Sequence, residues 1–207
     1  GFIGLGKLGR DAAEVLAEKH DVVGYDPNVT VDGLSGTLEE TCKDKDVVLV
    51  AVQTPHDPKY GGETPTSHLE PKDFDYSYLI QAVKDVDALV DKGTLISVIS
   101  TVLPGTVRRE ILPLIKNGRF IYNPYLIAQG TVKWDMRYPE MIMIGTESGK
   151  EDGDSAILRN VYDPILEKSN VRYEIGTWEE IEALKVFYNT FITTKLCLVN
   201  MIQDVAM

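Results

Sequence analysis

Short apolar runs alternate along the chain with segments in which apolar residues recur every three or four positions. The runs at residues 46–52 and 94–100 are β-branched and too continuous for exposed strands, so they predict buried parallel strands. Shorter strands are predicted at residues 1–3, 22–25, 120–122, 141–144 and 171–175. Because strands alternate with helical segments, we expect an α/β fold with a doubly wound, mostly parallel sheet and ligands at the carboxyl ends of its strands.

Two segments between these strands make specific predictions. Thr106 follows the second buried run and is expected to cap a helix that contains Ile111 and Leu114. Residues 56–74 are polar and rich in proline and glycine, and they leave the carboxyl end of a predicted strand. A loop of this length is usually functional or disordered, and one in this position is placed to cover a ligand.

The first nine residues carry the pattern G-x-G-x-x-G between an apolar strand and a helix. In this arrangement Gly4 allows a tight turn, Gly6 leaves room for phosphates and Gly9 lets the helix lie close to the strand. The turn, which also contains Lys7 and Leu8, presents backbone N–H groups to a pyrophosphate. Asp26 ends the next apolar run, about 20 residues further on, where a carboxylate can accept both ribose hydroxyls of an adenosine. These features predict a Rossmann-like domain that binds NAD, since Asp26 would repel the 2′-phosphate of NADP.

From Thr177 to its last residue the chain predicts one long helix. Thr177 and Glu180 have the spacing of a capping box. The helix is apolar on nearly all sides, apart from a polar stripe that includes Lys185 and Asn189, and such a helix is normally buried. We therefore expect residues 1–175 to form the NAD-binding domain and residues 176–207 to begin a central linker and homodimerisation helix, with a further domain absent from this sequence.

Composition narrows the class of protein. With 32 acidic and 21 basic residues the net charge is −11, and no basic patch that would bind nucleic acid is evident. No apolar stretch reaches the 18 residues that suggest a membrane span. Two cysteines are too few for a disulfide framework, and no metal-binding spacing stands out. We expect a soluble protein in the reducing cytoplasm, without a metal centre.

Six stretches, in order, resemble the UDP-glucose/GDP-mannose dehydrogenase family, the NAD-dependent oxidoreductases that oxidise a nucleotide-sugar alcohol to a uronic acid. They are GFIGLGKLG at residue 1, QTP at Gln53, STVLPGT at Ser100, NPYLIAQG at Asn123, YPEMIMIG at Tyr138 and EALKVFYNTFITTK at Glu182. Their order and spacing extend over nearly the whole chain. The resemblance implies an NAD-dependent nucleotide-sugar dehydrogenase domain.

The resemblance also implies roles for individual residues. Thr54, Pro55 and Thr101 would contact the cofactor, and Thr101 would also hold the catalytic water. Lys185 would steady negative charge on the reacting oxygen with Asn189 as its hydrogen-bonding companion. Substrate contacts would come from Leu126, Ile127, Gln129 and Lys185.

The sequence departs from the family's pattern at the motif NPEFLxEG. Tyr125 and Gln129 replace its two glutamates, and an amide cannot act as a general base at neutral pH. The family's nucleophilic cysteine lies in a later segment that this sequence does not contain. We therefore expect this chain alone not to form a uronic acid.

Two other functions stay open at this point. One is a β-hydroxyacid dehydrogenase-like oxidoreductase, a related fold that also uses a helical lysine and asparagine. The other is an NAD-binding module that performs no chemistry, in which Lys185 and Asn189 would belong to a solvated polar stripe. Thr101 would then only bond its own turn.

Overall fold

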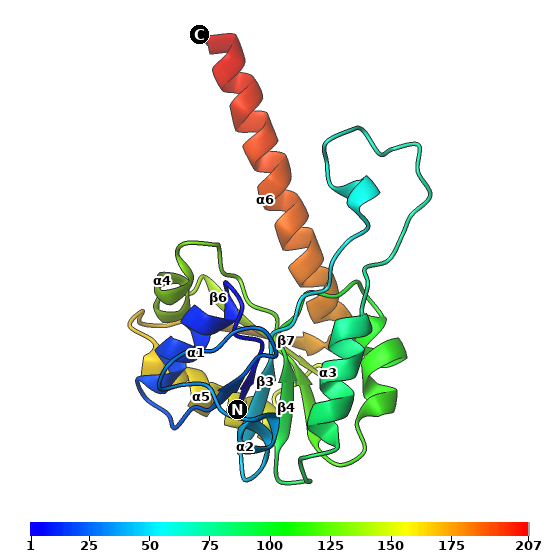
Figure 1. Ribbon diagram of the computed structural model, residues 1–207. Coiled ribbons are helices and arrows are strands. Elements are labelled where there is room, and N and C mark those ends of the chain that lie inside the picture. The colour runs from blue at the N-terminus through cyan, green and yellow to red at the C-terminus, as the bar shows by residue number, and fades with distance from the viewer. Residues whose placement is uncertain (207) are drawn as a thin grey trace.

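The structure is a computed structural model that describes residues 1–206. Within these residues seven strands form one sheet, and helices cover both of its faces (Figure 1). The strands are β1 (Phe2–Ile3), β2 (Gly24–Tyr25), β3 (Val47–Val50), β4 (Leu95–Val98), β5 (Arg119–Tyr122), β6 (Met141–Thr146) and β7 (Arg172–Thr177). The helices are α1 (Gly9–Ala17), α2 (Leu38–Cys42), α3 (Ser77–Asp87), α4 (Val132–Arg137), α5 (Gly153–Tyr162) and α6 (Trp178–Ala206). Short helical turns lie at η1 (Pro58–Tyr60), η2 (Val107–Ile111), η3 (Leu112–Leu114) and η4 (Asp163–Ile165).

The order of the strands confirms a doubly wound sheet. They run β2-β1-β3-β4-β5-β6-β7, and every neighbouring pair is parallel except β5 and β6. The order reverses at β1 and β3, because the chain continues from β1 to β2 on one side and then crosses to β3 on the other. A crevice at such a reversal, beyond the carboxyl ends of the strands, is where open α/β sheets bind ligands.

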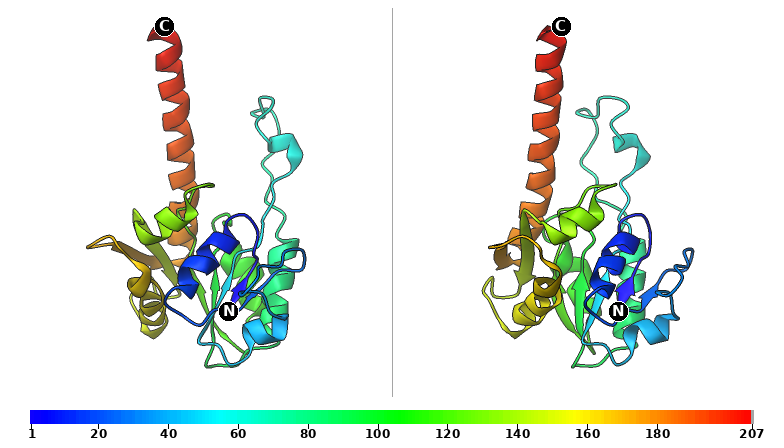
Figure 2. Two further views of the ribbon diagram at one scale, coloured as in Figure 1. Left: turned by 60° about the vertical axis from the view of Figure 1, so that its left-hand side comes forward. Right: turned by 90° about the vertical axis from the view of Figure 1, so that its left-hand side faces the viewer.

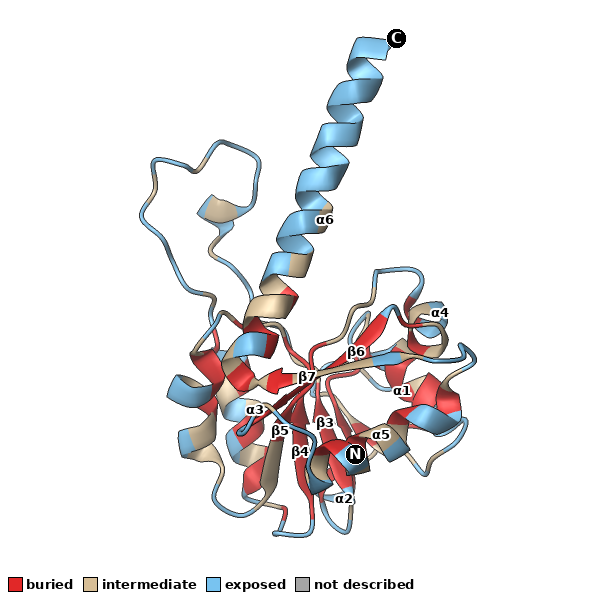
Figure 3. Cartoon of the chain, turned by 180° about the vertical axis from the view of Figure 1, so that it is seen from behind, coloured by how far each residue is buried: buried red, intermediate tan, exposed pale blue. Residues whose placement is uncertain are grey.

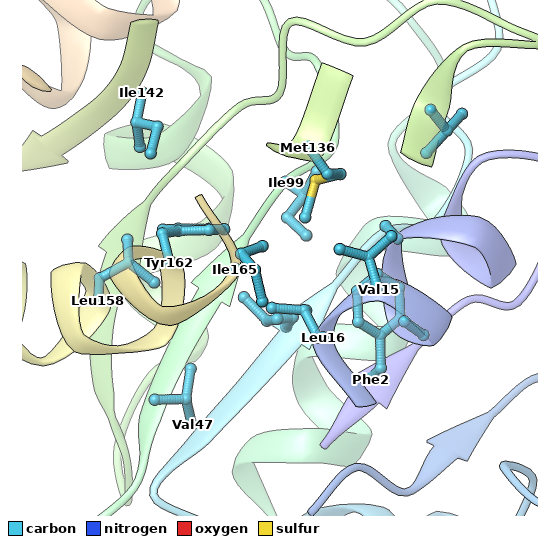
Figure 4. Close-up of a cluster of buried hydrophobic side chains, with 14 of the residues drawn as sticks. Phe2, Val15, Leu16, Val47, Ile99, Met136, Ile142, Leu158, Tyr162 and Ile165 are labelled. Atoms are coloured by element: carbon cyan, nitrogen blue, oxygen red, sulfur yellow. The ribbon is translucent and has the colours of Figure 1, made fainter. Parts of the chain in front are cut away.

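The sheet is buried between two apolar layers. On one face, α1, α4 and α5 pack against the strands through side chains such as Leu16, Met136 and Leu158 (Figure 4). On the other face, α3, η2 and the first turn of α6 form a second cluster. The strands themselves are mostly buried (Figure 3), which is why their sequences are continuous apolar runs rather than alternating ones.

The segment after β4 differs from the prediction. Residues 107–114 form a π-helical turn and a 3₁₀ turn instead of one α-helix, and Pro113 lacks the N–H that an α-helix would use there. The predicted capping role of Thr106 is wrong, because its hydroxyl donates to the hydroxyl of Tyr76 at 3.2 Å and not to the helix. By contrast, the capping box of α6 is confirmed: Thr177 N donates to Glu180 Oε2 at 2.7 Å and Glu180 N donates to Thr177 Oγ1 at 3.3 Å.

Helix α6 and the loop of residues 56–74 both project from the edge where the parallel strands end (Figures 1 and 2). Only the first turns of α6 are buried. Beyond them its large apolar side chains are exposed, among them Phe187, Phe191, Leu198, Ile202 and Val205. The expected burial of this helix is therefore not provided by the chain itself. None of the helices within residues 1–206 combines the length and the apolar character needed to cross a membrane.

Candidate functional site

The glycine turn has the shape that its sequence predicts. Gly4 has a φ of +97°, which side chains disfavour, and a Cβ there would lie 2.4 Å from the carbonyl oxygen of Ala51. A Cβ on Gly9 would lie 1.9 Å from the carbonyl oxygen of Gly4. Gly6 faces open space, and a Cβ there would meet nothing within 4 Å. Gly4 and Gly9 are thus needed for the fold, whereas Gly6 leaves open space in which a ligand can approach the backbone.

The turn also presents hydrogen-bond donors. Among residues 1–206, the backbone N–H groups of Gly6, Lys7 and Leu8 have no acceptor, while the carbonyls of Gly6 and Leu8 accept bonds that begin α1. The positive end of the α1 dipole lies at the same place. Free N–H groups, an open Gly6 and a helix N-terminus together fit the pyrophosphate of a dinucleotide.

Asp26 lies directly beside this turn. Its Oδ2 accepts from Leu5 N at 2.9 Å, and its Oδ1 accepts from Asn28 N at 2.8 Å and Val29 N at 3.1 Å. A carboxylate offers about four lone-pair sites, so three bonds leave one site for a ligand. The side chain is held at the edge of the turn, and in this conformation it can accept one ribose hydroxyl rather than two.

A cavity of about 200 Å³ lies between the glycine turn and the ends of β3 and β4. Its lining includes Leu8, Gly9, Thr54, Thr101, Ile127 and Lys185. The hydroxyl of Thr54 donates to the carbonyl oxygen of Thr101 at 2.7 Å, which ties the exits of the two strands together. Thr54 therefore shapes this cavity by joining its two walls.

A second, larger cavity of about 680 Å³ lies between α4 and α6. Its lining includes Leu126, Ile127, Lys168, Lys185, Tyr188 and Asn189. Ile127 and Lys185 belong to both cavities. Residues from distant parts of the sequence thus meet around one lysine, and a molecule in either cavity would lie next to its side chain.

Lys185 is buried, with 7% of its surface exposed, and burial lowers its pKa to about 8. Its ammonium donates to Asn189 Oδ1 at 3.3 Å. No carboxylate lies within 4.0 Å of its amine among the described residues. A cation with so little compensation is suited to attract negative charge that develops on a ligand.

Six predicted site residues lie outside both cavities: Gly4, Gly6 and Asp26, which form the glycine turn and its edge, and Lys7, Gln129 and Pro55. Lys7 and Gln129 are exposed, and neither lines a cavity. Pro55 is also exposed, and its carbonyl accepts from Asp75 N at 2.8 Å to close the stem of the 56–74 loop. The structure therefore brings together the lysine, the asparagine and the two threonines, but it leaves Gln129 at the surface.

Other polar groups at the site were not predicted from the sequence. Tyr125 has its hydroxyl 2.8 Å from that of Tyr162, which bonds in turn to Asn123 Oδ1. Burial raises the pKa of Tyr125 well above its usual value, so this phenol does not replace a glutamate as a base. Tyr188 donates to Glu140 Oε2 at 2.5 Å at the rim of the larger cavity. No motif marks these pairings, because their members are far apart in the sequence.

Comparison with known families decides what kind of domain this is. A family model described as the NAD binding domain of the UDP-glucose/GDP-mannose dehydrogenase family matches residues 28–166, more than half of the chain. The chain belongs to this family. It carries the family's NAD-binding domain, and this assignment confirms the cofactor predicted from the glycine turn.

Individual relatives support the assignment. UDP-glucose 6-dehydrogenase of Rickettsia typhi is 30% identical over 145 residues, which cover 68% of this chain and 32% of the relative. GDP-mannose 6-dehydrogenase of Pseudomonas aeruginosa is 27% identical over 245 residues, which cover 99% of this chain and 52% of the relative. This second match includes nearly all of residues 1–27, which precede the matched part of the family model. The chain spans about a third to a half of these two relatives.

Solved structures show the same fold. A ternary complex of GDP-mannose dehydrogenase from Pseudomonas aeruginosa has a TM-score of 0.76 with this chain at 23% identity, covering 96% of this chain and 51% of that one. UDP-N-acetylmannosamine dehydrogenase from Pyrococcus horikoshii has a TM-score of 0.71 at 21% identity, covering 91% and 49%. The mostly parallel sheet followed by a long helix is therefore an arrangement that structures of nucleotide-sugar dehydrogenases share.

Proposed function

We propose that this chain is the NAD-binding part of a dehydrogenase that oxidises an alcohol carbon of a nucleotide sugar. The observation that carries the proposal is the position of Lys185, which lines both the cavity beside the glycine turn and the larger cavity between α4 and α6. A cofactor in the first cavity and a sugar in the second would meet at this residue. Hydride transfer requires that the alcohol carbon of the sugar and the cofactor lie in contact.

The proposal assigns the cofactor to the smaller cavity and the glycine turn. The turn binds the pyrophosphate, Asp26 accepts a ribose hydroxyl, and the exits of β3 and β4 hold the nicotinamide end. The residues in this group are Gly4, Gly6, Lys7, Leu8, Gly9, Asp26, Thr54, Pro55 and Thr101. When bound, NAD supplies the acceptor for the hydride that leaves the alcohol carbon.

The chain's own residues stabilise the oxygen of that alcohol. As its proton leaves, negative charge develops on the oxygen, and the ammonium of Lys185 with the amide of Asn189 is positioned to stabilise it. Thr101, at the wall of the smaller cavity, holds the water that receives the proton. Leu126 and Ile127 contact the sugar in the larger cavity, while the exposed Gln129 contacts only the outer part of the substrate.

The test is formation of NADH with UDP-glucose, UDP-N-acetylmannosamine or GDP-mannose. We expect NADH from the first oxidation, of the alcohol to the aldehyde, with one of them and no uronic acid, and we expect Lys185→Met to reduce this NADH formation by at least about a hundredfold. Lys195→Met is the matched control, because Lys195 is an exposed lysine on the same helix that lines neither cavity. Tight NAD binding without turnover of any nucleotide sugar would favour the non-catalytic module instead.

The proposal extends to the organisation of the protein. Residues 1–175 form the NAD-binding domain, and the segment predicted at 176–207, of which residue 207 lies outside the described residues, begins a central helix through which two copies associate as a homodimer. The exposed apolar side chains of α6 support this association. Two free cysteines, Cys42 and Cys197, agree with a reducing cytoplasmic location, which fluorescence of a tagged protein in cells would test.

A further inference from the structure

The first turns of α6 are fixed to the segment that follows β4. Glu182, on α6, is completely buried. Its Oε2 accepts from Gly105 N at 2.5 Å and its Oε1 accepts from Val107 N at 2.7 Å. We call residues 101–107 the β4 exit turn. Both carboxylate oxygens of Glu182 are thus used to hold this turn against the helix.

A carboxylate is unusually well suited to this position. Two backbone N–H groups point at it, and each needs an acceptor, which one ionised carboxylate supplies with its two oxygens. A buried charge is costly unless such bonds compensate it. Burial raises the pKa of Glu182, and the two N–H bonds oppose that rise. The charge of Glu179 raises the pKa further, and that of Arg109 lowers it. No ion pair involving Glu182 exists within residues 1–206.

The same turn forms part of the proposed site. It begins at Thr101, whose carbonyl oxygen accepts from the hydroxyl of Thr54 at 2.7 Å. Lys185 lies three residues after Glu182, on the same side of α6. Because Thr101 and Lys185 line one cavity, the bonds of Glu182 connect the two walls that carry them.

Other contacts at the start of α6 are weaker. Arg108 pairs with Glu179 at 2.5 Å, but both side chains are exposed, at 53% and 38%, and exposed ion pairs contribute little. Arg108 also lies 5.0 Å from the ring centre of Trp178. Glu182 differs because its bond with Val107 N is buried, so water does not reach that donor to replace a lost bond.

We propose that Glu182 is a positioning residue that sets the place of the Lys185 ammonium relative to Thr101 and to the cofactor cavity. It touches neither cavity and acts only through the β4 exit turn and α6. The importance of Glu182 for catalysis rests on the proposed function. Its effect on the position of the Lys185 ammonium does not depend on that function.

Two variants separate position from charge. Glu182→Gln keeps the shape but turns an amide NH₂ toward one of the two N–H donors, so one bond is lost along with the charge. Glu182→Asp keeps the charge but is one methylene too short to reach both donors. Glu179→Gln is the control, since it removes an exposed carboxylate from the same turn of α6. None of the three substitutions changes Trp178 or Ile181, which anchor the start of α6 in the core.

The first readout is the pKa of Lys185, followed by NMR of labelled lysine side chains and assigned by its absence in Lys185→Met. In the wild type we expect a pKa of about 8, because burial lowers it. If Glu182 positions Lys185, both Glu182 variants let water reach the amine, so its pKa rises toward 10.5, while Glu179→Gln leaves it unchanged. An unchanged pKa in both variants would overturn the inference. A lower pKa of Lys185 in Glu182→Gln alone would also overturn it, because that result would reflect only the loss of a nearby negative charge.

The second readout is turnover in the assay with nucleotide sugars. We expect kcat to fall by about ten- to a hundredfold in both Glu182 variants, because small displacements of a reacting group have effects of this size, with little change in the KM for NAD. The pKa of Lys185 can rise in the Glu182 variants while neither the wild type nor any variant oxidises a nucleotide sugar. In that case the proposed function fails and the positioning role stands. Loss of the melting transition in both variants would show that Glu182 holds the whole fold, and it would overturn the inference.

Discussion

At the scale of single residues, burial of the Lys185 ammonium has a cost in free energy. A charged amine with one amide partner, Asn189 at 3.3 Å, loses most of its hydration without gaining an ion pair. Proteins keep such groups mainly where chemistry uses them. The lowered pKa therefore has a consequence for stability as well as for function.

We predict that Lys185→Met stabilises the protein at neutral pH. The amine has a pKa of about 8 when folded and 10.5 when exposed, so between these values the unfolded chain binds more protons and the free energy of unfolding of the wild type rises with pH. Below pH 8 the charged lysine costs on the order of 3 kcal/mol. Melting of both proteins at pH 7 and pH 9.5 should show an advantage of the variant that shrinks at the higher pH. A difference independent of pH would contradict this.

Asp26 makes a second prediction at this scale. Asp26→Asn removes the charge but keeps an oxygen that can accept from Leu5 N. We expect the affinity for NADP to rise by about tenfold, since a 2′-phosphate would no longer meet an anion, and the affinity for NAD to fall slightly. Calorimetric titration of both cofactors measures this. Asp32→Asn serves as the control, because Asp32 is exposed. A wild type that binds NADP as tightly as NAD would refute the role of Asp26.

At the scale of elements, the glycine turn shows what a sequence pattern can specify. The strand, the three glycines, the helix and the acid are all local, so their sequence predicts their arrangement. The segment after β4 shows the opposite. Thr106 had the right residue type for a cap, but Tyr76, 30 residues away, is the partner of its hydroxyl. The short helix α4 was not predicted at all, because six residues carry too little periodicity.

The glycines allow stability and binding to be separated. In Gly9→Ala the new methyl group would lie 1.9 Å from the carbonyl oxygen of Gly4, so α1 must move and we expect a loss of about 1–3 kcal/mol. Gly6→Ala meets nothing within 4 Å, so its melting should match the wild type. NAD binding should nevertheless weaken in Gly6→Ala, because the methyl group occupies the space of the phosphates. Unimpaired binding by this variant would place the pyrophosphate elsewhere.

At the scale of the whole molecule, the fold class was predictable but the site was only partly so. The alternation of buried runs and helices predicted the sheet, including its mostly parallel pairing. Cavity residues such as Lys185 and Thr101 were predicted from family motifs rather than from a physical pattern. Another residue predicted in this way, Gln129, is exposed and lines neither cavity. No role for Glu182 was predicted from the sequence. Its burial depends on the β4 exit turn, and no periodicity reports a contact between residues 75 or more positions apart.

The last prediction concerns assembly. Phe187, Phe191, Leu198, Ile202 and Val205 are between 55% and 89% exposed on the part of α6 that extends away from the domain. An apolar surface of this kind on a soluble protein usually marks an interface, and side chains at spacings of three, four and seven suit packing against another helix. We therefore expect sedimentation to show a dimer.

Variants of α6 test whether this face causes the association. Phe191→Glu with Leu198→Glu places two charges on the exposed apolar face, where burial against a second helix would be costly. We expect this double variant to sediment as a monomer with the same melting temperature and the same affinity for NAD, since neither residue contacts the domain core. Asn200→Glu is the control, because Asn200 lies on the opposite side of the helix from Phe191, nine residues away at about 100° per residue. A wild type that stays monomeric at high concentration, or a double variant that still dimerises, would show that α6 does not join two copies of this chain.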